Sequence, residues 1–395
     1  MKAKLPIVLV VLFSITTSFS QQYIPGYATV VNQTTQANIT ARLTEFQNLG
    51  VKRRGTTALQ NTLNWLKTAY LSYGYTASQM VEDSYTYSGS TAICKNLILT
   101  KVGTVYPNRY VIICGHYDTI AGTGTNDNGS GTAIILEIAR LLQNIPTEYS
   151  IKFINFSGEE DGLRGSQHYV NNVVNATTPK MDIKVVFNLD EVGGVAGETN
   201  DTITCDVDES TPTSNNAASV VVTNELATCV DLYSPLNTWI NFAAATDYIP
   251  FENNGEIITG FYETNISSHP HTSSDTLANM DVVYCYNVGK AAIGAAMHFA
   301  VANTAVLDNE LFNAGNQVSF FPNPAKGFLN INKGNLTDSS YTFSIVDIHG
   351  KTVLSQHYDV SSLIEILNVS SLNTGVYLGV LETENQRITK KIIIE

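Results

Sequence analysis

The feature that most constrains the fold is a series of short apolar runs that alternate with stretches of helical periodicity. Three runs are predominantly apolar, Val111 to Cys114, Ile151 to Phe156 and Ile183 to Leu189, as expected of strands buried on both faces. Helical patterns follow the first two runs, at Thr132 to Leu142 and around Ser166 to Val174. The alternation predicts an α/β fold with a mostly parallel or mixed sheet covered by helices on both faces.

Two further regions frame this pattern. Upstream, Ala37 to Gly74 predicts two amphipathic helices separated by a polar break. After about Ala302 the helical periodicity stops, and from Phe320 onward short alternating runs are separated by turn signals such as His349-Gly350. Short strands at this spacing predict a small all-β sandwich. We therefore expect a large domain over residues 21–302, a linker over 303–317 and the sandwich over 318–395.

The first 20 residues have the anatomy of a secretory signal peptide. Lys2 and Lys4 precede an apolar run from Leu5 to Phe13, and small polar residues then lead to Ser20, after which we place the cleavage site. A membrane anchor is the alternative, although the run is shorter than the roughly 20 residues that cross a bilayer. Cleavage would yield a soluble, exported protein.

Charge and cysteine content exclude some classes of protein. The chain has 22 Lys and Arg against 35 Asp and Glu, and the resulting net charge of -13 repels phosphate backbones, so no nucleic-acid partner is expected. The 5 cysteines are too few for a disulfide-dense scaffold, and their odd number leaves at least one unpaired within the chain. Cys205 and Cys229 both fall in a stretch predicted to be loop-rich, so they are a candidate disulfide.

Residues that can bind metals or move protons follow the predicted strands, where an open α/β sheet forms its functional crevice. They are His116 and Asp118, Asp127 before the next helix, Glu159 and Glu160, Asp190, and, much later, His271. The two imidazoles and three of these five carboxylates, those of Asp127, Glu160 and Asp190, form a donor set suited to zinc. Two ions about 3.5–4 Å apart also need a carboxylate that can bridge them. Taken singly, each residue has an ordinary structural explanation, such as a helix N-cap for Asp127.

The adjacent pair Glu159-Glu160 offers two carboxylates for two tasks. One can bind metal, and the other can take a proton from an attacking water and pass it to a leaving amine. The residue pattern alone leaves open which carboxylate does which.

The ordered set resembles the secreted co-catalytic di-zinc aminopeptidases typified by bacterial leucyl aminopeptidase. The motifs that carry the resemblance are His116-x-Asp118, Asn126 to Gly131, Gly158-Glu159-Glu160-x-Gly162, Asn188-Leu189-Asp190, Thr246-Asp247 and His271-Thr272-x-x-Asp275-Thr276. The resemblance covers roughly Ala37 to Ala302. It implies a zinc exopeptidase fold and two zinc ions per chain.

The resemblance also implies roles for the metal-type residues. His116, Asp190 and Asp127 would hold one zinc, and Asp127 would bridge to a second zinc held by Glu160 and His271.

Outside the ligand set, the resemblance implies that Glu159 is the general base and acid, and that Asp118 orients the imidazole of His116. The chain departs from the family pattern at Thr246-Asp247-Tyr248, where Ser-Asp-His is common. Tyr248 and Tyr262 are candidates for the oxyanion-stabilising tyrosine of relatives. His269 lies close enough to compete with His271 as a ligand.

The C-terminal stretch resembles the sorting domain of the type IX secretion system. The resemblance rests on Phe321-Pro322-Asn323-Pro324, the stretch from Tyr341 to Lys351, Leu372 to Tyr377 and the closing Lys390 to Glu395. It implies that the type IX secretion machinery is a partner and that the protein passes through the periplasm and is secreted or held at the cell surface. A carbohydrate- or cell-wall-binding sandwich is the alternative.

The expected function is that of a secreted, monomeric zinc aminopeptidase that hydrolyses the N-terminal residues of peptide substrates. A single-zinc glutaminyl cyclase is the alternative with a similar fold, and the presence of His116 and Asp190, which would complete a second metal position, argues against it. A non-catalytic binding domain is a further alternative, and the complete set of ligands and base argues against that.

Overall fold

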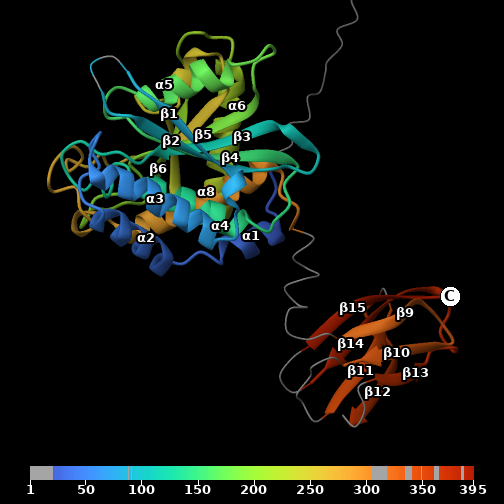
Figure 1. The fold of residues 1–395 in the computed structure, drawn as a ribbon. Coiled ribbons are helices and arrows are strands. Elements are labelled where there is room, and N and C mark those ends of the chain that lie inside the picture. The colour runs from blue at the N-terminus through green and yellow to red at the C-terminus, as the bar shows by residue number, and fades with distance from the viewer. Residues whose placement is uncertain are drawn as a thin grey trace, which may run out of the picture. The chain divides into compact units, whose positions relative to one another are not determined.

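A computed structural model of the chain describes residues 21–87, 89, 91–304, 318–333, 340–347, 349–359, 364–383 and 387–395. The chain divides into two compact units, Met1–Thr304 and Ala305–Glu395 (Figure 1). The predicted signal peptide, residues 1–20, lies outside the described residues. Residues 305–317 of the predicted linker also lie outside them.

The first unit is built on an eight-stranded sheet. Its strands are β1 (Met80–Tyr85), β2 (Cys94–Lys101), β3 (Tyr106–His116), β4 (Tyr149–Phe156), β5 (Asp182–Leu189), β6 (Thr202–Val207), β7 (Asn237–Phe242) and β8 (Ile258–Glu263). Its α-helices are α1 (Pro25–Val31), α2 (Gln36–Asn48), α3 (Thr57–Ser72), α4 (Gly129–Leu142), α5 (Arg164–Tyr169), α6 (Asn216–Tyr233), α7 (Ile249–Asn253) and α8 (Val282–Ala300). Shorter helical turns are η1 (Ala77–Gln79), η2 (Val170–Val174) and η3 (Leu277–Asn279).

The sheet is mixed, with the strand order β1-β2-β4-β3-β5-β8-β6-β7. The neighbours β4, β3, β5 and β8 are parallel, which brings their carboxyl ends to one edge. The pairings of β1 with β2, β2 with β4 and β6 with β8 are antiparallel. The predicted α/β class is confirmed. The apolar runs do not predict β1 or β7, because few side chains of these edge strands are buried.

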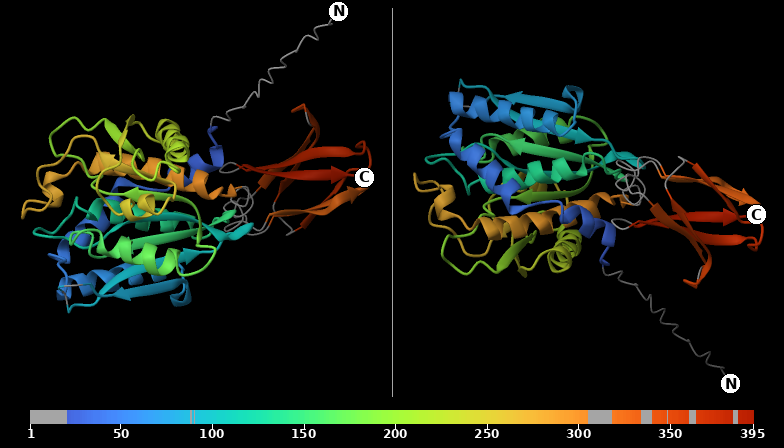
Figure 2. Two further views of the ribbon diagram at one scale, coloured as in Figure 1. Left: turned by 90° about the horizontal axis from the view of Figure 1, so that it is seen from above. Right: turned by 90° about the horizontal axis from the view of Figure 1, so that it is seen from below.

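Helices cover both faces of this sheet, as the sequence predicts. On one face, Tyr169 of α5 and Phe251 of α7 join a core with Ile112 and Ile154 of the sheet. On the other face, Phe187 of β5 packs against Phe299 of α8 and Phe261 of β8. In the view from below in Figure 2, α8 in orange lies beside α4 and the dark blue helices α1 and α2.

The start of α4 is anchored directly to the end of β5. The Asn128 side chain caps the helix by accepting from the Gly131 amide at 2.9 Å, and its Nδ2 donates to the Leu189 carbonyl at 2.8 Å. A Cβ at Gly131 would collide with that same carbonyl, so glycine permits the close approach. The contact places Asp127, just before α4, beside Asp190, just after β5.

The second unit is all-β, as predicted. Its strands are β9 (Ser319–Lys326), β10 (Phe328–Asn332), β11 (Ser340–Val346), β12 (Thr352–Asp359), β13 (Ile364–Asn368), β14 (Gly375–Glu382) and β15 (Arg387–Ile394). One antiparallel group contains β9, β10 and β13, and the other contains β11, β12, β14 and β15. A single parallel bridge between Ile394 and Ala325 joins them. Alternate side chains such as Phe343, Ile345 and Ile392 form the core.

The candidate disulfide is not formed. Cys205 lies in β6 and Cys229 in α6, so the stretch between them is not loop-rich as expected. Both are buried free thiols, like the other three cysteines, and the Cys229 thiol donates to Oε1 of Gln21 at 3.0 Å. Within the described part of the chain, no helix combines the length and apolarity needed to cross a membrane.

Candidate metal centre

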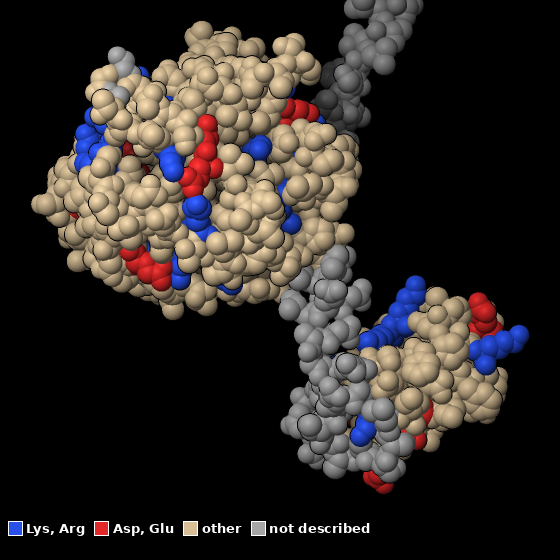
Figure 3. All heavy atoms as spheres, in the orientation of Figure 1, with Lys and Arg blue, Asp and Glu red and all other residues tan. Residues whose placement is uncertain are grey.

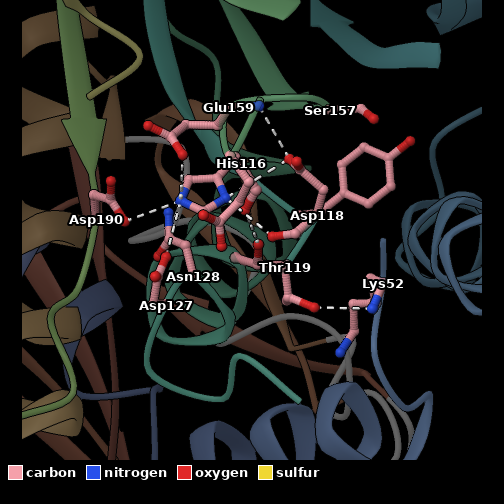
Figure 4. A network of polar contacts seen from close by, with 12 residues as sticks. Lys52, His116, Asp118, Thr119, Asp127, Asn128, Ser157, Glu159 and Asp190 are labelled. Atoms are coloured by element: carbon pink, nitrogen blue, oxygen red, sulfur yellow. Dashed lines mark hydrogen bonds and ion pairs between the residues drawn. The ribbon is translucent and has the colours of Figure 1, made fainter. Parts of the chain in front are cut away.

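The predicted site residues meet at the carboxyl edge of the parallel strands. His116 is the last residue of β3, Asp190 follows β5, and Asp127 lies just before α4. Glu160 follows β4, and His271 comes from the long loop after β8. In Figure 4, the His116 ring lies with Asp127 and Asp190 on one side and Asp118 on the other.

Three of these side chains form a first metal-type group. Nε2 of His116 lies 3.2 Å from Oδ1 of Asp127 and 3.3 Å from Oδ1 of Asp190. All three side chains are buried, and their ligand atoms lie within 4.8 Å of one another. One imidazole and two carboxylates that converge in this way can bind a divalent ion such as zinc.

Asp127 also belongs to a second group. Nε2 of His271 lies 3.1 Å from Oδ2 of Asp127 and 3.0 Å from Oε2 of Glu160. The other Glu160 oxygen, Oε1, is buried and has no hydrogen-bond partner among the described residues. A buried carboxylate oxygen without a partner is costly, so it fits a site built for a cation. Asp127 directs one oxygen into each group, as a bridging ligand would.

The electrostatics are those of a crowded acidic site. Burial raises the pKa of Glu159 to about 10 and that of Glu160 to about 8, and the charges of neighbouring carboxylates add to both shifts. Burial would also raise the pKa of Asp127, but hydrogen bonds from His116 and His271 hold it well below its usual range. Burial thus favours the protonated forms of Glu159 and Glu160, and a cation bound beside them would favour their ionised forms instead.

Two other groups hold the ligands in place. Nδ1 of His116 lies 3.1 Å from the backbone carbonyl of Asp118 and 3.8 Å from its carboxylate, so the carbonyl is the nearer partner. The Asp118 carboxylate accepts from the backbone amide of Glu159 at 3.3 Å. On the opposite side, the hydroxyl of Thr246 donates to Oδ2 of Asp190 at 2.5 Å. The sequence pattern contained Thr246 without indicating this contact.

The remaining candidates from the sequence lie outside both groups. Nδ1 of His269 is 2.8 Å from the Ser274 hydroxyl, and only His271 joins the carboxylates. The buried Tyr248 hydroxyl donates to Oδ2 of Asp206 at 2.8 Å. Tyr262 donates to the carboxylate of Glu191.

Sequence reasoning gave no role to Asp275, although it is part of the motif that contains His271. Its carboxylate accepts from the backbone amides of Asn126 at 2.7 Å and Asp127 at 3.1 Å, and all three residues are buried. Asp275 therefore fixes the Asp127 loop to the loop that carries His271. The position of Asp275 in the motif His271-Thr272-x-x-Asp275-Thr276 was the available signal, but spacing does not show which amides a carboxylate contacts.

Asp275→Asn is expected to destabilise the protein, because an amide nitrogen cannot accept from a backbone N–H. One buried donor then loses its partner, at a cost of about 1–3 kcal/mol. Thermal unfolding should show a lower Tm, and zinc titration should show weaker binding. Asp201→Asn is the matched control, since Asp201 is exposed and its oxygen would still accept from Thr202. Equal Tm values for the two variants would contradict this role of Asp275.

The face shown in Figure 3 is mostly uncharged. Lys and Arg side chains are scattered among Asp and Glu on the first unit, without one extended patch of either sign.

An α/β sheet that gathers two His–carboxylate groups at the carboxyl ends of its parallel strands defines a class of proteins that bind metal ions in this crevice. Residues 96–296, half of the chain, match peptidase family M28, and the chain belongs to this family. Residues 319–395 match a secretion system C-terminal sorting domain.

Similarity to curated relatives is strongest over short segments. The chain is 44% identical over 84 residues to aminopeptidase YwaD of Bacillus subtilis, covering 21% of this chain and 18% of that protein. It is 26% identical over 231 residues to a probable zinc metalloprotease of Pyrenophora teres, covering 52% of this chain and 48% of the relative. The chain thus spans at most about half the length of these relatives.

Solved structures share the fold at low identity. LapA aminopeptidase of Legionella pneumophila superposes with a TM-score of 0.61 at 20% identity, covering 76% of this chain and 80% of that one. A glutaminyl cyclase of Macrostomum lignano superposes with a TM-score of 0.62 at 13% identity, covering 75% and 96%. These two solved structures establish the fold of the first unit. They do not distinguish peptide hydrolysis from glutaminyl cyclisation.

Proposed function

We propose that the first unit is a zinc-dependent aminopeptidase that removes N-terminal residues from peptides. The observation that carries the proposal is the shared Asp127, with one oxygen beside His116 and the other beside His271. Two adjacent groups with a common carboxylate are suited to two divalent ions. The aminopeptidase and zinc metalloprotease names of relatives support the same conclusion.

In this proposal, His116, Asp190 and Asp127 hold one ion, and Asp127, Glu160 and His271 hold the other. Bound zinc would lower the pKa of a water and polarise the peptide carbonyl.

Glu159 is the proposed general base. Its Oε2 lies 3.9 Å from Nε2 of His116, its side chain is 15% exposed, and it belongs to neither metal group. It is therefore free to take a proton from the attacking water and deliver it to the leaving amine. The contact between the Glu159 amide and Asp118 fixes the backbone from which this side chain extends.

Glutaminyl cyclase is the second candidate, because such enzymes share the fold. The completeness of the group formed by His116, Asp127 and Asp190 favours the two-ion peptidase. Metal analysis combined with a panel of amino-acid anilides, N-blocked peptides and N-terminal glutaminyl peptides separates the two. Two zinc ions and cleavage of unblocked substrates support the proposal. One zinc with cyclisation of glutaminyl peptides, or cleavage of blocked peptides, contradicts it.

We propose further that the second unit directs export through the type IX secretion machinery, to the medium or the cell surface. The match of residues 319–395 to a sorting domain supports this role.

Deleting residues 318–395 is expected to leave peptidase activity intact and to block export, because the metal groups lie wholly in the first unit. Activity in periplasmic and extracellular fractions of a host with this secretion system is the measurement. The full-length chain is the control. Undiminished secretion of the truncated chain would contradict the sorting role.

A further inference from the structure

Lys52 is a lysine whose side chain is buried inside the first unit. It lies between α2 and α3 and is 0% exposed. Its Nζ donates to the backbone carbonyls of Gly50 at 2.8 Å and Thr123 at 2.7 Å, and it lies 3.7 Å from the centroid of the Phe46 ring. Asp275 is the charged group that acts on it, and no ion pair joins the two in the described part of the chain. A lysine without a paired carboxylate is rarely buried to this extent, because its charge loses the solvation of water.

The two hydrogen bonds of Lys52 do not depend on its charge. Burial lowers the pKa of Lys52 to about 7, and the negative charge of Asp275 opposes this shift. A neutral amine keeps two N–H groups, one for each carbonyl, and the protonated form adds a third that can face the Phe46 ring. Lys52 can therefore hold both carbonyls in either protonation state.

The backbone of Lys52 holds the beginning of the loop that its side chain holds at Thr123. The Lys52 amide donates to the Thr119 hydroxyl at 2.8 Å, and its carbonyl accepts from the Thr119 amide at 3.3 Å. Figure 4 shows the contact between Lys52 and Thr119 at one side of the site. Thr119 directly follows Asp118, whose backbone carbonyl lies 3.1 Å from Nδ1 of His116. Lys52 thus binds both ends of residues 119–123.

The far end of this loop leads to the shared ligand Asp127. The Thr123 hydroxyl donates to the backbone carbonyl of Asp275 at 2.7 Å, and the carboxylate of Asp275 accepts from the Asp127 amide at 3.1 Å. A Cβ at Gly124, whose φ is 60°, would collide with the Thr119 side chain and the Asp127 carbonyl, so the loop is closely packed. A displacement of the loop at Thr123 would therefore move the backbone of Asp127.

We propose that Lys52 is a positioning residue for the metal centre, which sets the separation between the backbone that supports His116 and the backbone that carries Asp127. Lys52 belongs to neither metal group, and it holds the loop between them at both ends. Its effect should fall on metal binding and on kcat, because a fully buried side chain cannot contact a peptide. The inference rests on the proposed two-ion centre, but its metal measurements do not depend on which reaction that centre catalyses.

Lys52→Met tests this inference, since it removes the amine and keeps an unbranched side chain. Zinc affinity is expected to fall about 10-fold, the lower end of the range for losing a group that directly orients a ligand, because Lys52 acts through the loop. With leucyl anilide, kcat should fall by a similar factor, and KM should stay within about twofold of wild type. Cobalt substitution gives a readout besides activity, because the visible absorption of Co²⁺ depends on the geometry of its ligands. The absorption bands of the variant should differ from those of wild type.

Lys184→Met is the matched control, because Lys184 makes the same kinds of contact away from the metal groups. Its Nζ donates to the Phe299 carbonyl at 2.6 Å and lies 4.2 Å from the centroid of the Tyr149 ring, and burial lowers its pKa. Lys184 lies near the start of β5, whereas Asp190 follows the end of this strand. Both variants are expected to lower the Tm, and only Lys52→Met should change zinc affinity, the cobalt spectrum and kcat.

Lys52→Gln is a second variant that keeps an N–H donor on a shorter side chain, and its zinc affinity should lie between those of wild type and Lys52→Met. The inference is overturned if Lys52→Met matches Lys184→Met in zinc affinity and cobalt spectrum, or if its loss is confined to KM. It is also overturned if neither Lys52 variant folds while Lys184→Met does. A zinc-loaded wild-type protein that cleaves no anilide would instead contradict the proposed aminopeptidase function, and zinc affinity and the cobalt spectrum would still decide the role of Lys52.

Discussion

Glu159→Gln is expected to leave both zinc ions bound and to lower kcat by about 10²- to 10⁴-fold, the range typical of losing a general acid–base group. Glutamine has nearly the same volume as glutamate but cannot take a proton from water. Glu159 belongs to neither metal group, so its loss should not remove an ion. Steady-state kinetics and zinc content measured on the same preparation test both parts of the expectation.

Glu160→Gln is the matched control for this variant, since it changes the adjacent carboxylate in the same way. Glu160 lies 3.0 Å from His271 in the second group, so this variant should lose zinc. Loss of zinc from Glu159→Gln, with retention in Glu160→Gln, would reverse the two roles. Wild-type turnover by Glu159→Gln would place the base elsewhere.

Asp127→Ala is expected to reduce zinc content from two ions to one or none and to abolish activity. Asp127 supplies an oxygen to both groups, so both lose a ligand at once. The loss of zinc affinity should exceed the roughly 10- to 100-fold typical of removing only a hydrogen-bond partner of a ligand. Zinc raises the Tm of a protein whose folded state binds it, so the increase seen with wild type should be smaller or absent in the variant.

Asp206→Asn controls for the loss of a buried carboxylate near this site. Asp206 is outside both metal groups, and an asparagine oxygen would still accept from Tyr248. This variant should bind two ions and keep the zinc-dependent rise in Tm. An Asp127→Ala protein that also binds two ions would show that Asp127 is not a shared ligand.

Much of the first unit could be predicted from local sequence pattern. The buried strands β3, β4 and β5 produce apolar runs, and α4 produces a helical period, because burial on both faces demands apolar side chains at most positions. The edge strand β7 was not predicted, because its side chains are largely exposed and the burial signal is absent. The expected loop around Cys205 was wrong for a different reason: most side chains of β6 are buried, but the strand is short and mixes polar with apolar residues.

The candidate ligands were also found from sequence, because each follows a predicted strand or precedes a helix, and their order matches a family pattern. The contacts that hold them could not be found in this way. The Thr246 hydroxyl reaches Asp190, and Asp275 reaches the amides before α4, across long separations in the chain. Such contacts depend on strand order and loop packing, which no local periodicity encodes.

The sequence by itself determined the α/β and all-β parts, the positions of the central strands and the identity of a metal-type donor set. These follow from side-chain burial and from residue type, which act locally. The tertiary structure alone decided that Asp127 faces both imidazoles, and it agrees with the motif-based choice of His271 over His269. The reason is geometric: parallel strands far apart in sequence bring their ends to one edge, and only their packing sets which atoms meet there.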